Sequence, residues 1–345
     1  MQTLTVFTPA YNRAHTIGRT YKSLCSQKCK DFVWLIVDDG STDNTLELCN
    51  EYSNKDLRIF VFTQENKGPA SARNFGLNNA RGKYILFLDS DDDLSENIVF
   101  ELVNEMSSKK VDFVCCGYFE GDILKKGNLT IKNTKCYTGD VRGFLHNIDQ
   151  LLTSGILQAP WAKLYKKDLI SYYKILFPEN MVYGEDTIFV YEYLSRVNNA
   201  SMLEKPLYYH LIYQGSLSNR LVNNITDINI QLYTKLLNLL KRWDIPKKEE
   251  KISKHFINSI IYGTNTFFKN EYRLSKIERK KQINKILDDD FVKEFIFKYP
   301  LKTVHFKIFQ WSFRWKNPNF IIIFMTIKEN MRYVHKIIRR GAEVD

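Results

Sequence analysis

The first 120 residues alternate between short apolar runs and segments with helical periodicity. The apolar runs predict strands over 4–8, 33–37, 58–63, 83–88 and 111–118. The segments between them predict helices over 16–28, 43–53, 69–80 and 95–109, with Pro69 in a first turn and Ser95 as an N-cap. Strands that alternate with helices of this length favour right-handed βαβ crossovers. We therefore expect an α/β fold with a mostly parallel sheet.

The pattern becomes less regular after residue 120. It predicts a loop-rich hairpin over 121–145 and a mixture of helices and loops over 146–200. A further strand is predicted over 200–210. From about residue 225 the chain is helical by periodicity, with Pro246 and Pro300 as breaks. We therefore expect an α/β domain over 1–220 and a mainly helical region over 221–345.

Composition places the chain among soluble globular proteins, with 44% hydrophobic and 26% charged residues. The N-terminus has no charged segment leading into an apolar one, as a signal peptide would. No apolar run approaches the ~20 residues of a membrane span, and the longest covers 320–327. The six cysteines form no CxxC pair, which favours reduced thiols over a zinc site or disulfides. We therefore expect a cytoplasmic protein.

Charge is distributed unevenly along the chain. The net charge is +11, and residues 221–345 alone hold 25 Lys+Arg against 13 Asp+Glu. The excess positive charge therefore lies in the helical region, which suggests that this region meets an anionic partner.

The most basic stretch, 301–340, has nine Lys/Arg and one acidic residue interleaved with aromatic and aliphatic side chains. This pattern fits helices that lie in the interface of an anionic membrane, on the inner face of the cytoplasmic membrane. It equally fits helices whose apolar side packs in a bundle or a homodimer. Nucleic acid is not expected as a partner, because no recognition motif accompanies the charge.

Three polar segments follow the predicted strands at their carboxyl ends, at residues 8–11, 38–41 and 89–92. In open parallel sheets, ligands bind in the crevice outside these ends. The third segment belongs to FLDSDDDL, with four carboxylates within five residues, and such a cluster is strained unless a cation faces it. Hard oxygen ligands suit Mg²⁺ or Mn²⁺, which can hold a diphosphate, so Asp89, Asp91 and Asp92 are candidate ligands.

The alternative for these acids is a solvated turn followed by a helix start, and Asp93 fits that role. The chain has no GxxxxGK[ST] loop and no GxGxxG, so the phosphate cradles of P-loop and dinucleotide-binding proteins are missing.

Five motifs then point to one family. They are TPAYNR (8–13), VDDGSTDNT (37–45), NKGPASARNFGL (66–77), FLDSDD (87–92) and GEDTIF (184–189). In this order they resemble the family 2 glycosyltransferases with a GT-A fold, over about residues 1–220. The resemblance implies inverting transfer of a sugar from a UDP-sugar to a hydroxyl of a glycan or lipid-linked glycan, in surface polysaccharide synthesis.

The resemblance also implies roles for individual residues. Asp91 would ligate Mn²⁺ or Mg²⁺, and Asp186 would be the general base, with Glu185 beside it raising its pKa. The donor would be bound by Thr8, Pro9, Tyr11, Arg13, Asp39, Asn66, Gly68, Arg73, Asp89 and Ser90. The sugar and acceptor pocket would be lined by Trp161 and Lys163. His210 and Ser216 lie in a segment that resembles the one closing over the diphosphate.

Several of these residues could instead have ordinary structural roles. Glu185 and Asp186 could cap a helix, and Arg73 could be an exposed helix cation. Trp161 could belong to the core. Two other classes of protein also remain open: a nucleotidyltransferase, which would release pyrophosphate, and a non-catalytic nucleotide-binding subunit of a membrane assembly.

Overall fold

The computed structural model describes residues 3–122, 129–132, 135–181, 183–212, 224–245, 249–268 and 274–341, with backbone only for 122, 251 and 332–341. Contacts divide the chain into two compact units. Unit 1 comprises residues 1–219 and 238–245, and unit 2 comprises residues 220–237 and 246–345.

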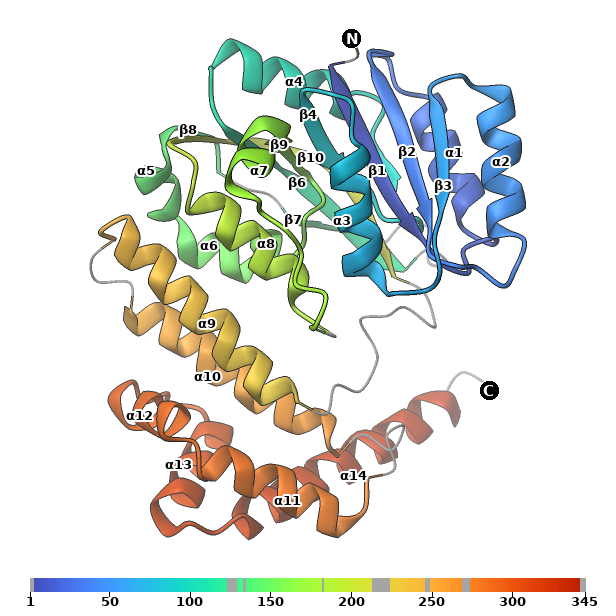
Figure 1. Cartoon of the computed structure of the whole chain (residues 1–345). Coiled ribbons are helices and arrows are strands. Elements are labelled where there is room, and N and C mark those ends of the chain that lie inside the picture. Colours follow the sequence, from blue (N-terminus) through green and yellow to red (C-terminus); the bar gives the residue numbers. More distant parts are fainter. Residues whose placement is uncertain are drawn as a thin grey trace. The chain divides into compact units, whose positions relative to one another are not determined.

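Unit 1 contains the alternating elements (Figure 1). Its first half comprises β1 (Leu4–Ala10), α1 (Ile17–Cys25), β2 (Phe32–Asp38), α2 (Thr45–Lys55), β3 (Ile59–Thr63), α3 (Pro69–Asn79), β4 (Tyr84–Phe87), β5 (Asp93–Leu94) and α4 (Ile98–Ser108). Its second half comprises β6 (Phe113–Asp122), β7 (Thr130–Lys132), β8 (Tyr137–Asp140), α5 (Val141–Leu145), α6 (Ile148–Thr153), the 3₁₀ turn Ile156–Gln158, β9 (Lys163–Lys166), α7 (Lys167–Tyr173), α8 (Glu185–Leu194) and β10 (Asn199–Ile212).

The strands form one mixed sheet in the order β3-β2-β1-β4-β9-β6-β10-β5. Strands β3, β2, β1 and β4 run parallel to one another, as expected from the βαβ pattern. Strand β9 runs antiparallel between β4 and β6, and β10 pairs in parallel with β6. The carboxyl ends of β1, β2 and β4 lie at the same edge, where the polar segments begin.

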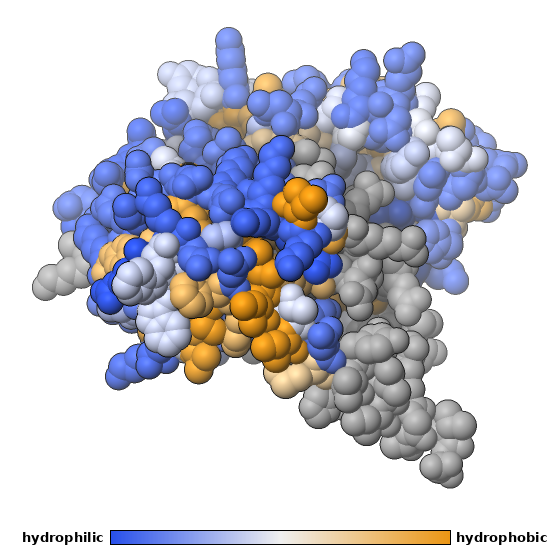
Figure 2. Space-filling model, turned by 90° about the horizontal axis from the view of Figure 1, so that it is seen from below, coloured by the Kyte–Doolittle hydropathy of each residue, from blue (hydrophilic) through white to orange (hydrophobic). Residues whose placement is uncertain are grey.

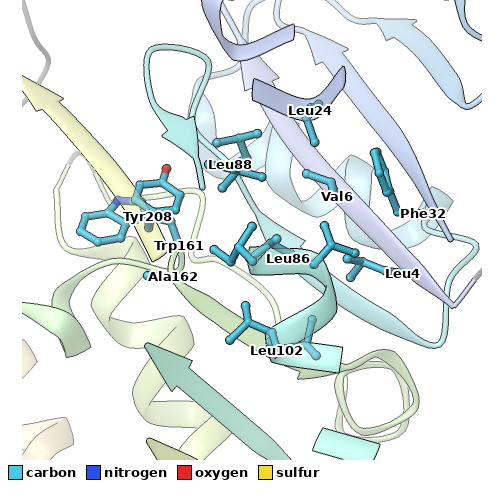
Figure 3. Close-up of a cluster of buried hydrophobic side chains, with 14 of the residues drawn as sticks. Leu4, Val6, Leu24, Phe32, Leu86, Leu88, Leu102, Trp161, Ala162 and Tyr208 are labelled. Atoms are coloured by element: carbon cyan, nitrogen blue, oxygen red, sulfur yellow. The ribbon is translucent and has the colours of Figure 1, made fainter. Parts of the chain in front are cut away.

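Helices cover both faces of this sheet, because successive side chains of a buried strand point to opposite faces. Figure 3 shows the core on one face, where Leu4 and Val6 pack with Leu24 of α1 and Leu102 of α4. On the other face, the Phe87 ring makes edge-on contacts with four aromatic rings, those of Phe7, Tyr165, Phe177 and Phe189. The result is a three-layer α/β/α architecture.

Helix α3 approaches the sheet closely at Gly76. A Cβ atom there would come within 2.0 Å of the Phe7 ring. That ring is buried and packs edge-on against Phe87 at 5.9 Å between centroids, so it has little room to move. The missing side chain therefore fixes how deeply α3 sits on β1.

Most sequence-based boundaries hold within two or three residues. Strand β1 continues through Pro9, which pairs in register with Val37, although the strand was expected to end there. The predicted N-cap at Ser95 is wrong. Its backbone N–H donates to Leu207 O at 2.9 Å beside the short strand β5, so the chain is still held against β10 and α4 starts three residues later, after Asn97.

Unit 2 is helical in its described residues. It contains most of α9 (Ile225–Arg242) and all of α10 (Glu249–Thr266), α11 (Lys276–Leu287), α12 (Asp290–Lys298), α13 (Val304–Trp315) and α14 (Asn319–Gly341). Its core includes Phe256, Phe295, Phe306 and Phe309. Pro300 separates α12 from α13 as expected, whereas Pro246 lies outside the described residues. No helix among the described residues combines the length and apolar character needed to cross a bilayer.

Candidate active site

The acidic segment after β4 forms a compact group of carboxylates. Oxygen atoms of Asp89, Asp91 and Asp92 lie within 4.8 Å of one another. Asp92 is buried and fastened to β10: Oδ2 accepts from the Tyr208 hydroxyl at 2.7 Å, and Oδ1 accepts from Leu211 N–H at 2.9 Å. Asp89 and Asp91 are more open, and Arg13 Nε lies 3.6 Å from Asp91 Oδ2. The two outer carboxylates are thus the accessible ones.

Arg73 joins this group to the acidic pair at the start of α8. Its Nη2 lies 3.4 Å from Asp89 Oδ1, and its Nη1 lies 3.3 Å from Glu185 Oε1 and 2.7 Å from Asp186 Oδ1. The residue is 5% exposed, so Arg73 is not an exposed helix cation. Burial opposes its charge, but the three carboxylates outweigh burial and raise the pKa of the guanidinium further.

The Asp186 carboxyl holds its proton more strongly than an ordinary aspartate. Burial raises the pKa of Asp186 to about 8, against the lowering effect of Arg73, and Glu185 and Asp89 add to the rise. A carboxyl with such a pKa can exchange a proton near neutral pH, which is the property a general base needs.

Local backbone geometry presents this pair at the beginning of a helix. Gly184 precedes Glu185 with φ +85°, a left-handed conformation that glycine adopts without strain. The chain therefore turns directly into α8, and both carboxylates fall in its first turn, where the helix dipole favours negative charge.

Asn74, the next residue on α3, holds the segment that leads to α8. Its Nδ2 donates to Phe177 O at 2.8 Å and to Glu179 Oε1 at 2.9 Å, and its Oδ1 accepts from Phe177 N–H at 2.9 Å. Arg73 and Asn74 together therefore fasten both the acidic pair and the chain before it to α3.

Replacing Asn74 with Ala should lower the free energy of unfolding by about 1–3 kcal/mol, because the buried backbone groups of Phe177 lose their partners. Thermal or urea unfolding measures this change. Asn79→Ala is the control on the same helix, since within the described part of the chain the Asn79 side chain bonds only to Phe75 O. Equal effects of the two substitutions would contradict the role given to Asn74.

Asp39 fastens a loop at the end of β2. Its Oδ1 accepts from Gln64 Nε2 at 2.7 Å and from Lys67 N–H at 3.0 Å, and its Oδ2 accepts from Gly68 N–H at 2.8 Å. The carboxylate has about four acceptor sites, and the donors among the described residues leave about one for a ligand. Asp39 thus positions the loop that begins α3.

Aromatic rings border the acidic group on the β10 side. The Trp161 indole stacks on Tyr208 at 4.8 Å and on His210 at 5.1 Å between ring centroids, and Figure 3 shows Trp161 beside Tyr208 at the end of the core. His210 Nδ1 lies 3.5 Å from Asp92 Oδ2. Burial lowers the pKa of His210, but the Asp92 carboxylate outweighs it and raises that pKa to about 9.

Lys163 is fully buried, and its Nζ lies 5.7 Å from the centroid of the Trp161 ring. Its Nζ donates to Ala159 O at 2.7 Å and to Trp161 O at 2.9 Å. Burial lowers the pKa of Lys163 to about 8. The ammonium group thus holds the turn that contains Ala162, whose φ is +55°.

The remaining predicted residues are less closely grouped. The Thr8 hydroxyl faces the core and accepts from Trp34 Nε1 at 2.8 Å. Ser90 is buried, and its carbonyl accepts from Thr20 Oγ1. Tyr11 and Asn66 are exposed, and Pro9 lies within β1. Ser216 lies outside the described residues.

Part of the sequence matches a known protein family. Residues 5–170 match the family described as Glycosyl transferase family 2. Residues 5–170 thus belong to glycosyltransferase family 2. The expected GT-A fold is confirmed by a solved structure, S. aureus TarS 1–349 in complex with UDP-GlcNAc, with a TM-score of 0.67 and 23% identity over 96% of this chain and 92% of that one.

Two curated glycosyltransferases are also similar. The chain is 27% identical to uncharacterized glycosyltransferase EpsJ of Bacillus subtilis (strain 168), over 59% of this chain and 60% of EpsJ. It therefore spans less than two thirds of that relative. It is 28% identical to the cholesterol galactosyltransferase of Borreliella burgdorferi, over 77% of this chain and 74% of the relative.

The carboxylates of this glycosyltransferase domain fit a hard divalent cation. Asp89 and Asp91 offer oxygen atoms at the open side of the group, whereas both Asp92 oxygens are already engaged by β10. One or two protein carboxylates, completed by water and phosphate oxygens, are the ligand set that Mg²⁺ takes in nucleotide sites.

Two residues of the glycosyltransferase site escaped the sequence analysis. Asn74 stands within the ARN triplet, but its partners lie over a hundred residues away. Tyr208, which holds Asp92, precedes His210 by two positions in the strand. The alternation of side chains along β10 places both on one face and could have indicated Tyr208.

Proposed function

We propose that the protein transfers a sugar from a UDP-sugar to an acceptor hydroxyl by a metal-dependent, inverting reaction. The observation that carries this proposal is the Arg73 cluster, which joins the carboxylates after β4 to Glu185 and Asp186. One side of the cluster suits a cation and a diphosphate, and the other carries a carboxyl with a raised pKa.

For the donor, we propose a UDP-N-acetylhexosamine as the first candidate. TarS, which shares the fold, was solved with UDP-GlcNAc. The Asp39 carboxylate, with a free acceptor site at the end of β2, would accept a hydrogen bond from a uracil N–H. Arg13, Asp89 and the backbone around Gly68 would contact the rest of the nucleotide.

Asp91, with Asp89 beside it, would hold Mn²⁺ or Mg²⁺ in this proposal. The cation, when bound, would neutralise charge on the departing diphosphate. Arg13 would have to exchange its contact with Asp91 for one with the donor, which an arginine can do because phosphate and carboxylate offer it similar geometry.

Asp186 would act as the general base. It would take the proton of the acceptor hydroxyl as the oxygen attacks the anomeric carbon, and the bond from that carbon to the UDP oxygen would break on the other side. A single displacement of this kind inverts the anomeric centre. Arg73 would keep the carboxyl oriented during the transfer.

For the acceptor, we propose a hydroxyl on a glycan or on a lipid-linked glycan, in assembly of a surface polysaccharide. The similarity to a cholesterol galactosyltransferase supports a lipid-borne hydroxyl. Trp161 and the loops over 121–165 would shape the acceptor pocket.

The test is release of UDP from a panel of UDP-sugars with Mn²⁺, using a crude lipid extract as acceptor. We expect release from one sugar, dependent on the extract. Release of pyrophosphate in place of UDP would indicate a nucleotidyltransferase. No turnover of any UDP-, dTDP- or GDP-sugar by a folded, UDP-binding protein would contradict the proposal.

Substituting Asp91 with Ala should abolish the metal dependence of donor binding. We expect the affinity for UDP with Mn²⁺ to fall at least about tenfold and to become insensitive to EDTA, because the cation loses the more important of its two carboxylates. Isothermal titration measures both. Asp93→Asn is the control, since Asp93 lies two residues further on and pairs with Arg19 at 2.9 Å. A chelator-sensitive Asp91→Ala variant would refute the assignment.

A further inference from the structure

Helix α13 is apolar on two opposite sides. Phe306, Phe309 and Phe313 face the core of unit 2. Val304, Trp311 and Trp315 recur at helical spacing on the other side and are exposed, Trp315 to 69%. A helix that is apolar on both sides normally buries both, so the outer stripe needs a partner.

Helix α14, which packs against α13, repeats the arrangement. Ile321, Ile322 and Met325 are buried in the core of unit 2. The exposed side carries a second stripe at the same spacing, made of Phe320, Ile323, Ile327 and Met331. At 1.5 Å per residue, each stripe runs for about 16 Å. Figure 2 shows an apolar patch bordered by hydrophilic residues on the face seen from below.

Positive charge accompanies the stripes. Lys307 and Arg314 are exposed on α13, on one flank of its stripe, and Lys302 and Lys316 are exposed near its two ends. Glu329 is the one acidic residue in the stretch 301–331. Apolar side chains and tryptophans bordered by cations suit a partner whose interior is apolar and whose outer layer is anionic.

We infer that the outer stripes of α13 and α14 bind the surface of an anionic lipid bilayer. A second copy of this chain would bring like charges together, whereas anionic headgroups are complementary to the flanking lysines and arginines. The helices would lie in the interface with the stripes among the acyl chains, since neither is long and apolar enough to cross. The inference does not depend on the proposed sugar transfer.

The test is co-sedimentation of the full chain with vesicles. We expect binding to phosphatidylcholine vesicles that contain about 30 mol% phosphatidylglycerol, weak binding to pure phosphatidylcholine, and loss of binding when KCl rises from about 0.1 M to about 0.5 M. Absence of binding to the anionic vesicles would overturn the inference, and so would equal binding to both kinds of vesicle.

The double substitution Trp311→Ser/Trp315→Ser should weaken binding at least about tenfold, and Lys307→Glu/Arg314→Glu should do the same. The control is Leu57→Ser/Tyr172→Ser, which removes two exposed apolar side chains from unit 1 and should leave vesicle binding unchanged. Circular dichroism and thermal unfolding check that each variant folds. Unchanged binding by the folded tryptophan variant would overturn the inference.

Sedimentation velocity tests the alternative that a second copy of the chain covers the stripes. If the wild type self-associates and Trp311→Ser/Trp315→Ser is monomeric without any change in lipid binding, the stripes are a contact between copies and the inference fails. Release of UDP in the presence of a water-soluble acceptor should be the same in wild type and variant. This readout separates a failure at the lipid surface from a failure of the proposed chemistry.

Discussion

Asp186→Asn should leave UDP binding within about threefold of wild type and lower kcat by a factor on the order of 10² or more. At pH 7 a carboxyl with a pKa of about 8 is mostly protonated, so the uncharged amide resembles the resting state and should disturb the Arg73 cluster little. The amide cannot accept the acceptor proton, so the chemical step slows. Steady-state turnover and UDP titration measure the two quantities.

The same residue predicts a pH profile. Because a base works only when deprotonated, kcat/KM should rise about tenfold per pH unit below pH 8 and level off above it, and Asp186→Asn should lose this limb. Glu185→Gln is the matched control, because Glu185 shares Arg73 as its partner at 3.3 Å. Its effect on kcat should be much smaller. A normal turnover rate in Asp186→Asn would show that another group is the base.

Arg73→Met should lower the free energy of unfolding by about 3–5 kcal/mol, the usual consequence of removing one partner from a buried group of charges. The substitution leaves Asp89, Glu185 and Asp186 close together without the cation that holds them. The methionine keeps most of the apolar stem, which limits loss of packing. Urea unfolding at neutral pH measures the change.

The loss in Arg73→Met should be smaller at pH 5 than at pH 8. Without the guanidinium the three carboxylates repel one another, and protonation relieves that repulsion as the pH falls. Arg58→Met is the control, since Arg58 forms a partly exposed ion pair with Asp56 at 2.6 Å, and removing it should change stability by less than about 1 kcal/mol. A loss in Arg73→Met no larger than in Arg58→Met would mean that the cluster is not a stabilising unit.

The parallel half of the sheet was predictable because its strands obey simple patterns. Strand β2 is buried along its whole length and reads as a continuous apolar run, and Pro69 opens α3 as expected. Strand β9 was not predicted. It has the sequence KLYK, and the first lysine, Lys163, is fully buried on two carbonyls. A strand with two lysines in four positions carries no apolar signal, and its place between β4 and β6 depends on pairing far along the chain.

The site, like the sheet, has a part that the sequence predicts and a part that depends on tertiary packing. The resemblance of the motifs to the family implied roles for Arg73, Asp89, Asp91, Glu185 and Asp186, although acids after strands and at helix starts also occur as turns and caps. The motifs did not indicate that Arg73 would join two of them. That contact depends on how α3 and α8 pack, which is a property of the tertiary structure. The roles of these residues in transfer remain predictions, which the substitutions above test.

The close approach of α3 to β1 at Gly76 limits which parts of the protein can change in evolution. Because a single methyl group at that position would collide with Phe7, helix α3 can pack at its present depth only while that position stays glycine. Arg73 lies one helical turn earlier, so its height above the sheet is set by backbone contact. A descendant of this sequence that took up a different sugar would therefore have to vary its loops, while the interior beneath Arg73 stayed as it is.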